Sequence, residues 1–196
     1  MAQAAQSSPM SFRDYVEFER TADAKHEFLD GHVWAMAGGT LEHAQLAANI
    51  IGELRGRLER GPCKVFSADA RIRVAATGLA TYPGVTVICG PIERDPEDAN
   101  TAMNPTVIVE VLSDSSEAYD RGDKFAHYRQ IASLRTYVLV SQHEPRIEIY
   151  RRNSDETWTL EDARLGVDAK IPGLCSIPVS AVYADVELPP VPPRPQ

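Results

Sequence analysis

The sequence predicts a single domain of the α/β or α+β class. Residues 106–112 read Thr-Val-Ile-Val-Glu-Val-Leu, and apolar side chains fall on both faces of this strand except at Glu110, which is typical of a central strand covered on both sides. Apolar residues recur at helical spacing after Thr40, and Asp30-Gly31 between two apolar runs indicates a hairpin. Helices and short strands mixed around one central strand define this fold class.

The composition is that of a globular protein. Of the 196 residues, 43% are hydrophobic and 24% are charged, which excludes collagen-like, coiled-coil and wholly disordered chains. The net charge of −8 argues against broad capture of nucleic acid, although basic residues recur over 55–73 and leave a local basic groove open. No stretch reaches the roughly 18 apolar residues of a membrane span, and the N-terminus lacks a signal-peptide pattern. We therefore expect a cytoplasmic protein with no membrane partner.

The domain limits follow from local composition. We expect a flexible leader over residues 1–10, one domain over 11–188 and a Pro-rich disordered tail over 189–196. The three cysteines, Cys63, Cys89 and Cys175, are odd in number and form no CxxC pair, so we predict reduced thiols rather than disulfides or a zinc site.

The elements before the central strand are predicted from caps and periodicity. Ser11 and Asp14 resemble a capping box that begins a short helix ending near Arg20. A longer helix follows Thr40 and ends at the stop signal Arg60-Gly61-Pro62. The predicted strands cover about 25–30, 32–37, 63–67, 70–75 and 85–89. Several prolines and acidic residues predict an exposed loop over 90–105.

After the central strand we predict one helix over about 117–131, which places Lys124, Tyr128 and Ile131 on one face. Strands follow at 136–140 and 146–150, with a further pair at 157–161 and 169–172. Ser176-Ile-Pro178 opens a last short helix that ends near residue 183.

Glu110 is the most informative candidate for a functional residue. A carboxylate within an apolar strand is costly unless it is paired or bound to a metal, so we interpret Glu110 as a metal ligand or an acid–base group. The alternative is that Glu110 meets an arginine or solvent at the strand end. Lys124, on the next helix, is either aimed at this strand end or a solvated surface lysine.

Three further residues have two interpretations each. His43 shares the apolar stripe of the long helix with Ala47 and Ile50, which favours a packed histidine. Glu27 and Asp69 are either ordinary polar positions or the edge of a site. The motifs of phosphate loops, zinc proteases and hydrolase elbows are absent from the sequence.

Taken in order, these segments resemble the Uma-type restriction endonuclease-like family, within the PD-(D/E)xK nuclease superfamily. The segments that carry the resemblance are His26-Glu-Phe-Leu-Asp-Gly-His-Val-Trp-Ala-Met36, His43, Ser67-Ala-Asp-Ala-Arg71, Tyr82-Pro-Gly-Val85, Asn104-Pro-Thr-Val-Ile-Val-Glu-Val-Leu-Ser113, Tyr119-Asp-Arg-Gly-Asp-Lys124, Tyr128 and Thr136-Tyr-Val-Leu-Val140. The resemblance implies a mixed central sheet flanked by helices. It also implies DNA as the partner. A homodimer is expected on the same ground, because two active sites are suited to cutting the two strands of a duplex.

The resemblance implies a carboxylate pair that holds Mg²⁺ or Mn²⁺ and a lysine that helps the attacking water. Glu110 would then be both a metal ligand and a catalytic residue, with Lys124 as the catalytic lysine. The superfamily usually has its lysine two residues after the glutamate, where this chain has Leu112. Glu27, His43, Asp69 and Tyr128 are the candidate supporting residues.

One position departs from the family pattern. The family has Asp after the proline of the Tyr-Pro segment, and this chain has Gly84, so the first carboxylate of the metal site is missing. One carboxylate holds Mg²⁺ weakly, and Glu27 or Asp69 is the candidate replacement. Two hypotheses remain: a metal-dependent DNA endonuclease that hydrolyses phosphodiester bonds, impaired by Gly84, or a catalytically inactive nuclease-fold module for nucleic-acid binding or assembly.

Overall fold

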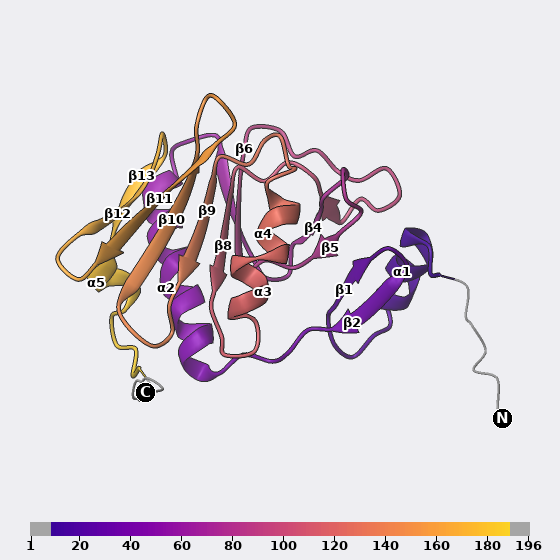
Figure 1. Ribbon diagram of the computed structural model, residues 1–196, viewed down its shortest axis with the longest axis horizontal. Coiled ribbons are helices and arrows are strands. Elements are labelled where there is room, and N and C mark those ends of the chain that lie inside the picture. Colours follow the sequence, from indigo (N-terminus) through magenta and orange to yellow (C-terminus); the bar gives the residue numbers. More distant parts are fainter. Residues whose placement is uncertain (1–8, 189–196) are drawn as a thin grey trace.

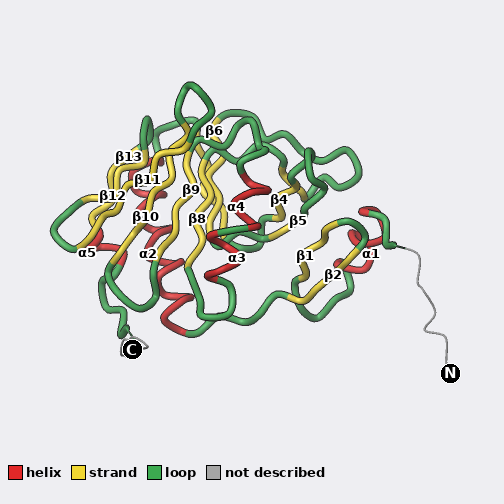
Figure 2. The backbone as a smooth tube through the Cα atoms, in the orientation of Figure 1, coloured by secondary structure: helices red, strands yellow, loops and turns green. Residues whose placement is uncertain are grey.

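A six-stranded mixed sheet forms the centre of the computed structural model, which describes residues 9–188. The predicted tail at 189–196 and nearly all of the predicted leader lie outside the described residues. In spatial order the strands are β11 (Trp158–Arg164), β10 (Arg146–Arg152), β9 (Thr136–Val140), β8 (Val107–Val111), β6 (Val85–Cys89) and β3 (Cys63–Ser67). β8 and β9 are parallel and the other neighbours are antiparallel. Figure 2 shows these strands side by side, with helices on two sides.

β8 is covered on both faces, as its pattern predicts. Val107, Val109 and Val111 belong to the core formed with α2 (Leu41–Leu58), whereas Ile108 belongs to the core formed with α4 (Asp123–Tyr128). All five residues of β8 are buried, so Glu110 lies inside the protein, on the face of α4. The expectation of a mixed sheet flanked by helices is confirmed.

A second, smaller sheet carries the N-terminal hairpin. Its strands, in order, are β2 (His32–Ala35), β1 (His26–Leu29), β5 (Ala80–Thr81), β4 (Arg71–Arg73) and β7 (Thr101–Ala102). The predicted capping box of Ser11 and Asp14 begins α1 (Phe12–Glu19), which packs on β1 through Tyr15 and Phe28. Figure 1 shows α1 and the hairpin at one end of the molecule, with β12 (Asp168–Ile171), β13 (Cys175–Pro178) and α5 (Val179–Val182) at the other.

Several expected elements differ in the structure. Ser176-Ile-Pro178, expected to open the last helix, belongs to the strand β13, and α5 begins only at Val179. The expected helix over 117–131 is two short helices, α3 (Glu117–Arg121) and α4, because the backbone of Gly122 lies outside the helical region. The loop over 90–105 is not simply exposed: β7 pairs with β4, and the side chains of Asp95 and Asp98 are buried. Their partners are Arg73 and Arg71, whose guanidinium groups offset the cost of burying the carboxylates.

The expectation of three reduced cysteines is wrong. Cys63 begins β3 and Cys89 ends β6, and the register of the two strands places these residues opposite each other, where they form a disulfide. A pairing of strands far apart in the sequence cannot be derived from cysteine spacing alone. Cys175 is a free thiol. Within residues 9–188, no helix combines the length and the apolar character that crossing a membrane requires.

Candidate functional site

The candidate site is centred on the ammonium group of Lys124, which three buried carboxylates surround. Lys124 Nζ lies 3.0 Å from Glu110 Oε1, 3.1 Å from Glu27 Oε1 and 3.4 Å from Asp120 Oδ1. The three carboxylates come from β8, β1 and α3, so the large sheet, the N-terminal hairpin and a helix meet at this point. Lys124 is only 5% exposed, which contradicts the alternative of a solvated surface lysine.

Protein groups already satisfy Glu110 on both carboxylate oxygens. The Tyr128 hydroxyl donates to Oε1 at 2.9 Å, and the backbone N–H of Gly84 donates to Oε2 at 3.0 Å. The predicted burial of Glu110 is confirmed, and its partner is a lysine rather than the arginine or solvent of the alternative interpretation. These bonds hold the carboxylate in a single orientation toward Lys124.

Glu27 joins the site from the N-terminal hairpin. The hydroxyls of Thr81 and Tyr119 donate to its two carboxylate oxygens, the latter at 3.1 Å. Glu27 is only 4% exposed, although it lies three residues before the exposed Asp30 of the hairpin turn. Glu27 is therefore part of the same buried cluster as Glu110, which the sequence left open.

Asp120 is the residue of this cluster that sequence reasoning missed. It lies one helical turn before Lys124, and an acid four residues before a lysine is a pairing signal that we could have used. The expected helix over 117–131 places Asp120 on the same face as Lys124, and the structure buries Asp120 at 3% exposure.

Burial and charge shift the pKa values of the cluster. Burial opposes the charge of Lys124, but the carboxylates of Glu110, Glu27 and Asp120 outweigh it and raise the pKa of Lys124 well above its ordinary value. Burial, and then the charge of Glu110, raise the pKa of Asp120 from 3.8 to about 6, although Lys124 opposes this shift. One ammonium does not neutralise three carboxylates, and Asp120 takes up a proton as the pH falls to about 6.

We expect Asp120→Asn to be more stable than the native chain at pH 8 by about 2 kcal/mol. The folded state binds the Asp120 proton more tightly than the unfolded state does, so this residue lowers the unfolding free energy as pH rises from 3.8 to about 6. The asparagine removes that loss and flattens the pH dependence in this window. Urea unfolding at pH 4.5, 6 and 8 measures both effects.

The exposed pair of Asp69 and Lys25 provides the control for this experiment. Asp69→Asn removes a carboxylate that is 82% exposed, so its effect on the unfolding free energy should be below about 1 kcal/mol. A lower stability of Asp120→Asn than of the native chain at pH 8 would show that Lys124 requires the negative charge of Asp120.

Gly84 lies against Glu110, at the position where the family pattern has Asp. A Cβ atom added to Gly84 would lie 3.7 Å from Glu110 Oε2 and 3.2 Å from the carbonyl oxygen of Val109. A carboxylate at this position would therefore adjoin that of Glu110. In the native chain only a backbone N–H faces Glu110 from this side.

The remaining candidate residues, Tyr128, His43 and Asp69, differ in their position relative to Glu110. Tyr128 contacts Glu110 directly and is fully buried, and burial followed by the charge of Glu110 raises its pKa well above the ordinary value. His43 is half-buried rather than part of the buried stripe of α2, and its Nε2 lies 3.1 Å from the carbonyl oxygen of Val111. Asp69 contacts Lys25 and Ser67 at the surface, so it does not replace the missing carboxylate.

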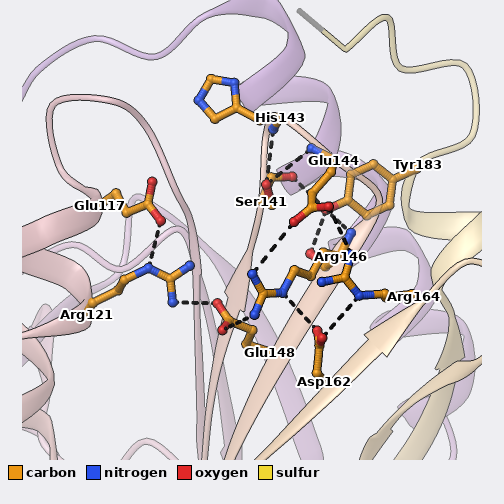
Figure 3. A network of polar contacts seen from close by, with 10 residues as sticks. All are labelled: Glu117, Arg121, Ser141, His143, Glu144, Arg146, Glu148, Asp162, Arg164 and Tyr183. Atoms are coloured by element: carbon orange, nitrogen blue, oxygen red, sulfur yellow. Dashed lines mark hydrogen bonds and ion pairs between the residues drawn. The ribbon is translucent and has the colours of Figure 1, made fainter. Parts of the chain in front are cut away.

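A second network of charges extends from the site across the same face of the sheet. Glu110 in β8 and Glu148 in β10 are both in register with Leu139 in β9, the strand between them. The three residues therefore lie in one row across the sheet. Arg121, which follows Asp120, pairs with Glu148, and Arg146 lies 2.9 Å from the same carboxylate. Figure 3 shows that the network continues to Asp162, Arg164 and Glu144.

These ion pairs determine whether the arginines near the site can form a basic groove. The arginines of the network each face at least one carboxylate, and Arg71 and Arg73 are paired with Asp98 and Asp95. The cations next to the candidate site are therefore matched by acids, and we find no basic groove there in the described part of the chain.

The carboxylate oxygens at the site do not fit the ligand sphere of a magnesium ion. Mg²⁺ requires near-octahedral oxygen ligands and keeps several waters. Here the oxygens of Glu110 and Glu27 accept hydrogen bonds from hydroxyls, an N–H and Lys124, and the ammonium group lies where the three carboxylates converge. Among residues 9–188, no group of three His, Cys, Asp or Glu side chains has an arrangement that could hold a metal. Gly84 supplies no further carboxylate.

The fold places the chain in the class of mixed α/β proteins with a central sheet flanked by helices. A solved structure described as "a putative nuclease belonging to DUF820", from Anabaena variabilis ATCC 29413, superposes with a TM-score of 0.73 at 13% identity, over 89% of this chain and 98% of that chain. The family described as "Uma2: Putative restriction endonuclease" matches residues 12–176, and the chain belongs to this family. The family resemblance of the sequence is thus confirmed.

Two proteins of Synechocystis sp. (strain ATCC 27184 / PCC 6803 / Kazusa) are similar in sequence. One, slr1290, is 35% identical over 151 residues, which is 77% of this chain and 78% of the relative. The other, sll1609, is 31% identical over 158 residues, which is 81% of this chain and 89% of the relative. Both are described as uncharacterized, so their similarity indicates no activity.

Proposed function

We propose that this chain is a catalytically inactive nuclease-fold module that acts by binding nucleic acid or by assembly. The observation that carries the proposal is the position of Lys124, whose ammonium group lies within 3.4 Å of three buried carboxylates while Gly84 adds none. The ammonium neutralises part of the negative charge that a metal ion neutralises in an active nuclease. The native residues therefore form a stable ion cluster in place of a metal site.

The second candidate is a metal-dependent DNA endonuclease that uses Mg²⁺ or Mn²⁺. It is favoured by the 3.0 Å approach of Lys124 to Glu110, because these two groups are the pair that the family resemblance assigns to catalysis. In that case the paired carboxylates must release Lys124 before a metal and a phosphate can enter. A homodimer would then serve to cut both strands of a duplex.

Nicking of supercoiled plasmid in the presence of Mg²⁺ or Mn²⁺ separates the two candidates. We expect the native chain to nick plasmid no faster than Glu110→Gln, which retains the shape of the side chain but loses its charge. Metal-dependent nicking by the native chain that Glu110→Gln abolishes would overturn the proposal in favour of the endonuclease.

Titration of a fluorescent DNA duplex in metal-free buffer tests the nucleic-acid part of the proposal. The net charge of −8 and the paired arginines predict weak binding that is lost as salt rises. Light scattering of the free protein and of the complex measures the assembly state in the same samples.

A further inference from the structure

The disulfide between Cys63 and Cys89 lies at the edge of the large sheet, apart from the carboxylate cluster. It joins the first residue of the edge strand β3 to the last residue of β6, just after the turn that follows α2. Both cysteines are only partly buried. Neither residue takes part in the interactions of Glu110 or Lys124, so the proposed function leaves this pair without a role.

A groove of about 270 Å³ opens onto one of the two sulfur-bearing residues. It lies between the C-terminal turns of α2 and the strand β3, and its lining consists of Arg55, Leu58, Glu59, Cys63, Lys64 and Val65. Cys63 therefore faces a space that a small molecule can enter, whereas Cys89 is not part of the lining.

The charged side chains of the groove favour the binding of an anionic ligand. Arg55 and Lys64 are both exposed and, within residues 9–188, neither forms an ion pair with a carboxylate. The one acid in the lining, Glu59, faces the neighbouring Arg60 at 3.8 Å. Cations near a sulfur atom stabilise a thiolate, which is the reactive form in disulfide exchange, and Arg55 and Lys64 line the same groove as Cys63.

We propose that Cys63–Cys89 is a redox-active disulfide that exchanges with a small anionic thiol bound in this groove. The thiolate of the small molecule attacks Cys63 Sγ, the bond between the cysteines breaks, and Cys89 leaves as a thiolate. A second thiolate then attacks the sulfur of the small molecule in this mixed disulfide, which releases Cys63 and the small-molecule disulfide. Two thiols thus supply the two electrons, and each cysteine takes up one of the protons they lose.

Exchange with glutathione, an anionic thiol, tests the site on the folded protein. A Cys175→Ser background removes the free thiol from the analysis. The protein is equilibrated with graded ratios of reduced to oxidised glutathione, alkylated, digested and analysed by mass spectrometry. We expect a reversible transition without urea, with glutathione attached at Cys63. A bond that resists reduction until the protein unfolds, or attachment confined to Cys89, would overturn the proposal.

Charge reversal in the groove tests the docking of the anionic thiol. We expect Arg55→Glu combined with Lys64→Glu to slow reduction by glutathione about tenfold and to leave reduction by the neutral thiol 2-mercaptoethanol within about twofold of its native rate. Arg60→Glu is the matched control, since Arg60 is exposed but does not line the groove. Equal slowing of both thiols would contradict docking. None of these outcomes depends on whether the chain cuts DNA.

Discussion

Gly84→Asp is expected to bind Mn²⁺ at least about tenfold more tightly than the native chain and to gain metal-dependent nicking of plasmid. The new carboxylate would lie beside Glu110, because a Cβ at this position is already 3.7 Å from Glu110 Oε2. Two adjoining carboxylates repel each other in a buried site, and a divalent cation removes that repulsion. Calorimetric titration with Mn²⁺ measures the affinity, and the plasmid assay measures the gain.

The stability of the same variant provides a readout that needs no activity. In EDTA we expect Gly84→Asp to lose about 2 kcal/mol of unfolding free energy, from charge repulsion and the close approach to the carbonyl of Val109. Mn²⁺ should restore the loss. Gly52→Asp is the control, because a Cβ at Gly52 meets nothing within 4 Å. Equal responses of the two variants to Mn²⁺ would refute the role of Gly84.

Lys124→Met is expected to lower the unfolding free energy by about 3–5 kcal/mol at pH 8, since it leaves three buried carboxylates without their cation. Carboxyl groups that lose this partner bind protons more tightly in the folded state than in the unfolded state. The loss should therefore shrink as pH falls toward 5, where the cluster takes up protons. Urea unfolding from pH 5 to pH 8 measures the trend.

Lys25→Met is the matched control for that experiment. Lys25 pairs with Asp69 at the surface, with its side chain 42% exposed, so we expect a loss below about 1 kcal/mol and little change with pH. If Lys124→Met behaved like Lys25→Met, the carboxylates would be held by their hydroxyl and N–H partners rather than by the ammonium group.

Local patterns predicted much of the fold. The capping box of Ser11, the hairpin at Asp30-Gly31 and the two-sided strand around Glu110 all depend on neighbouring residues, and the structure has each of them. The interruption at Gly122 and the short strand β7 were missed, because a backbone angle and a pairing with β4 decide them. The disulfide was missed for the same reason, since strand register brings Cys63 to Cys89.

The candidate site was predictable in part. Glu110 was conspicuous because its neighbours in the strand are apolar, and Lys124 followed from the family pattern. Asp120 has a similar burial but lies in a polar segment, where its spacing of four residues from Lys124 is the one sequence signal that points to it. Glu27 could not be assigned, because its partners Thr81 and Tyr119 come from distant parts of the chain.

The distance along the chain between Glu27 and its partners has a consequence for synthesis. Glu27 is followed by Thr81 after 54 residues and by Tyr119 after 92, and Lys124 comes later still. A ribosome releases the N-terminal hairpin first, so the acid of β1 stays unpaired until α3 and α4 have emerged. The hairpin therefore gains its buried ion pair only after Lys124 has been made, 97 residues after Glu27, and its docking waits for α3 and α4.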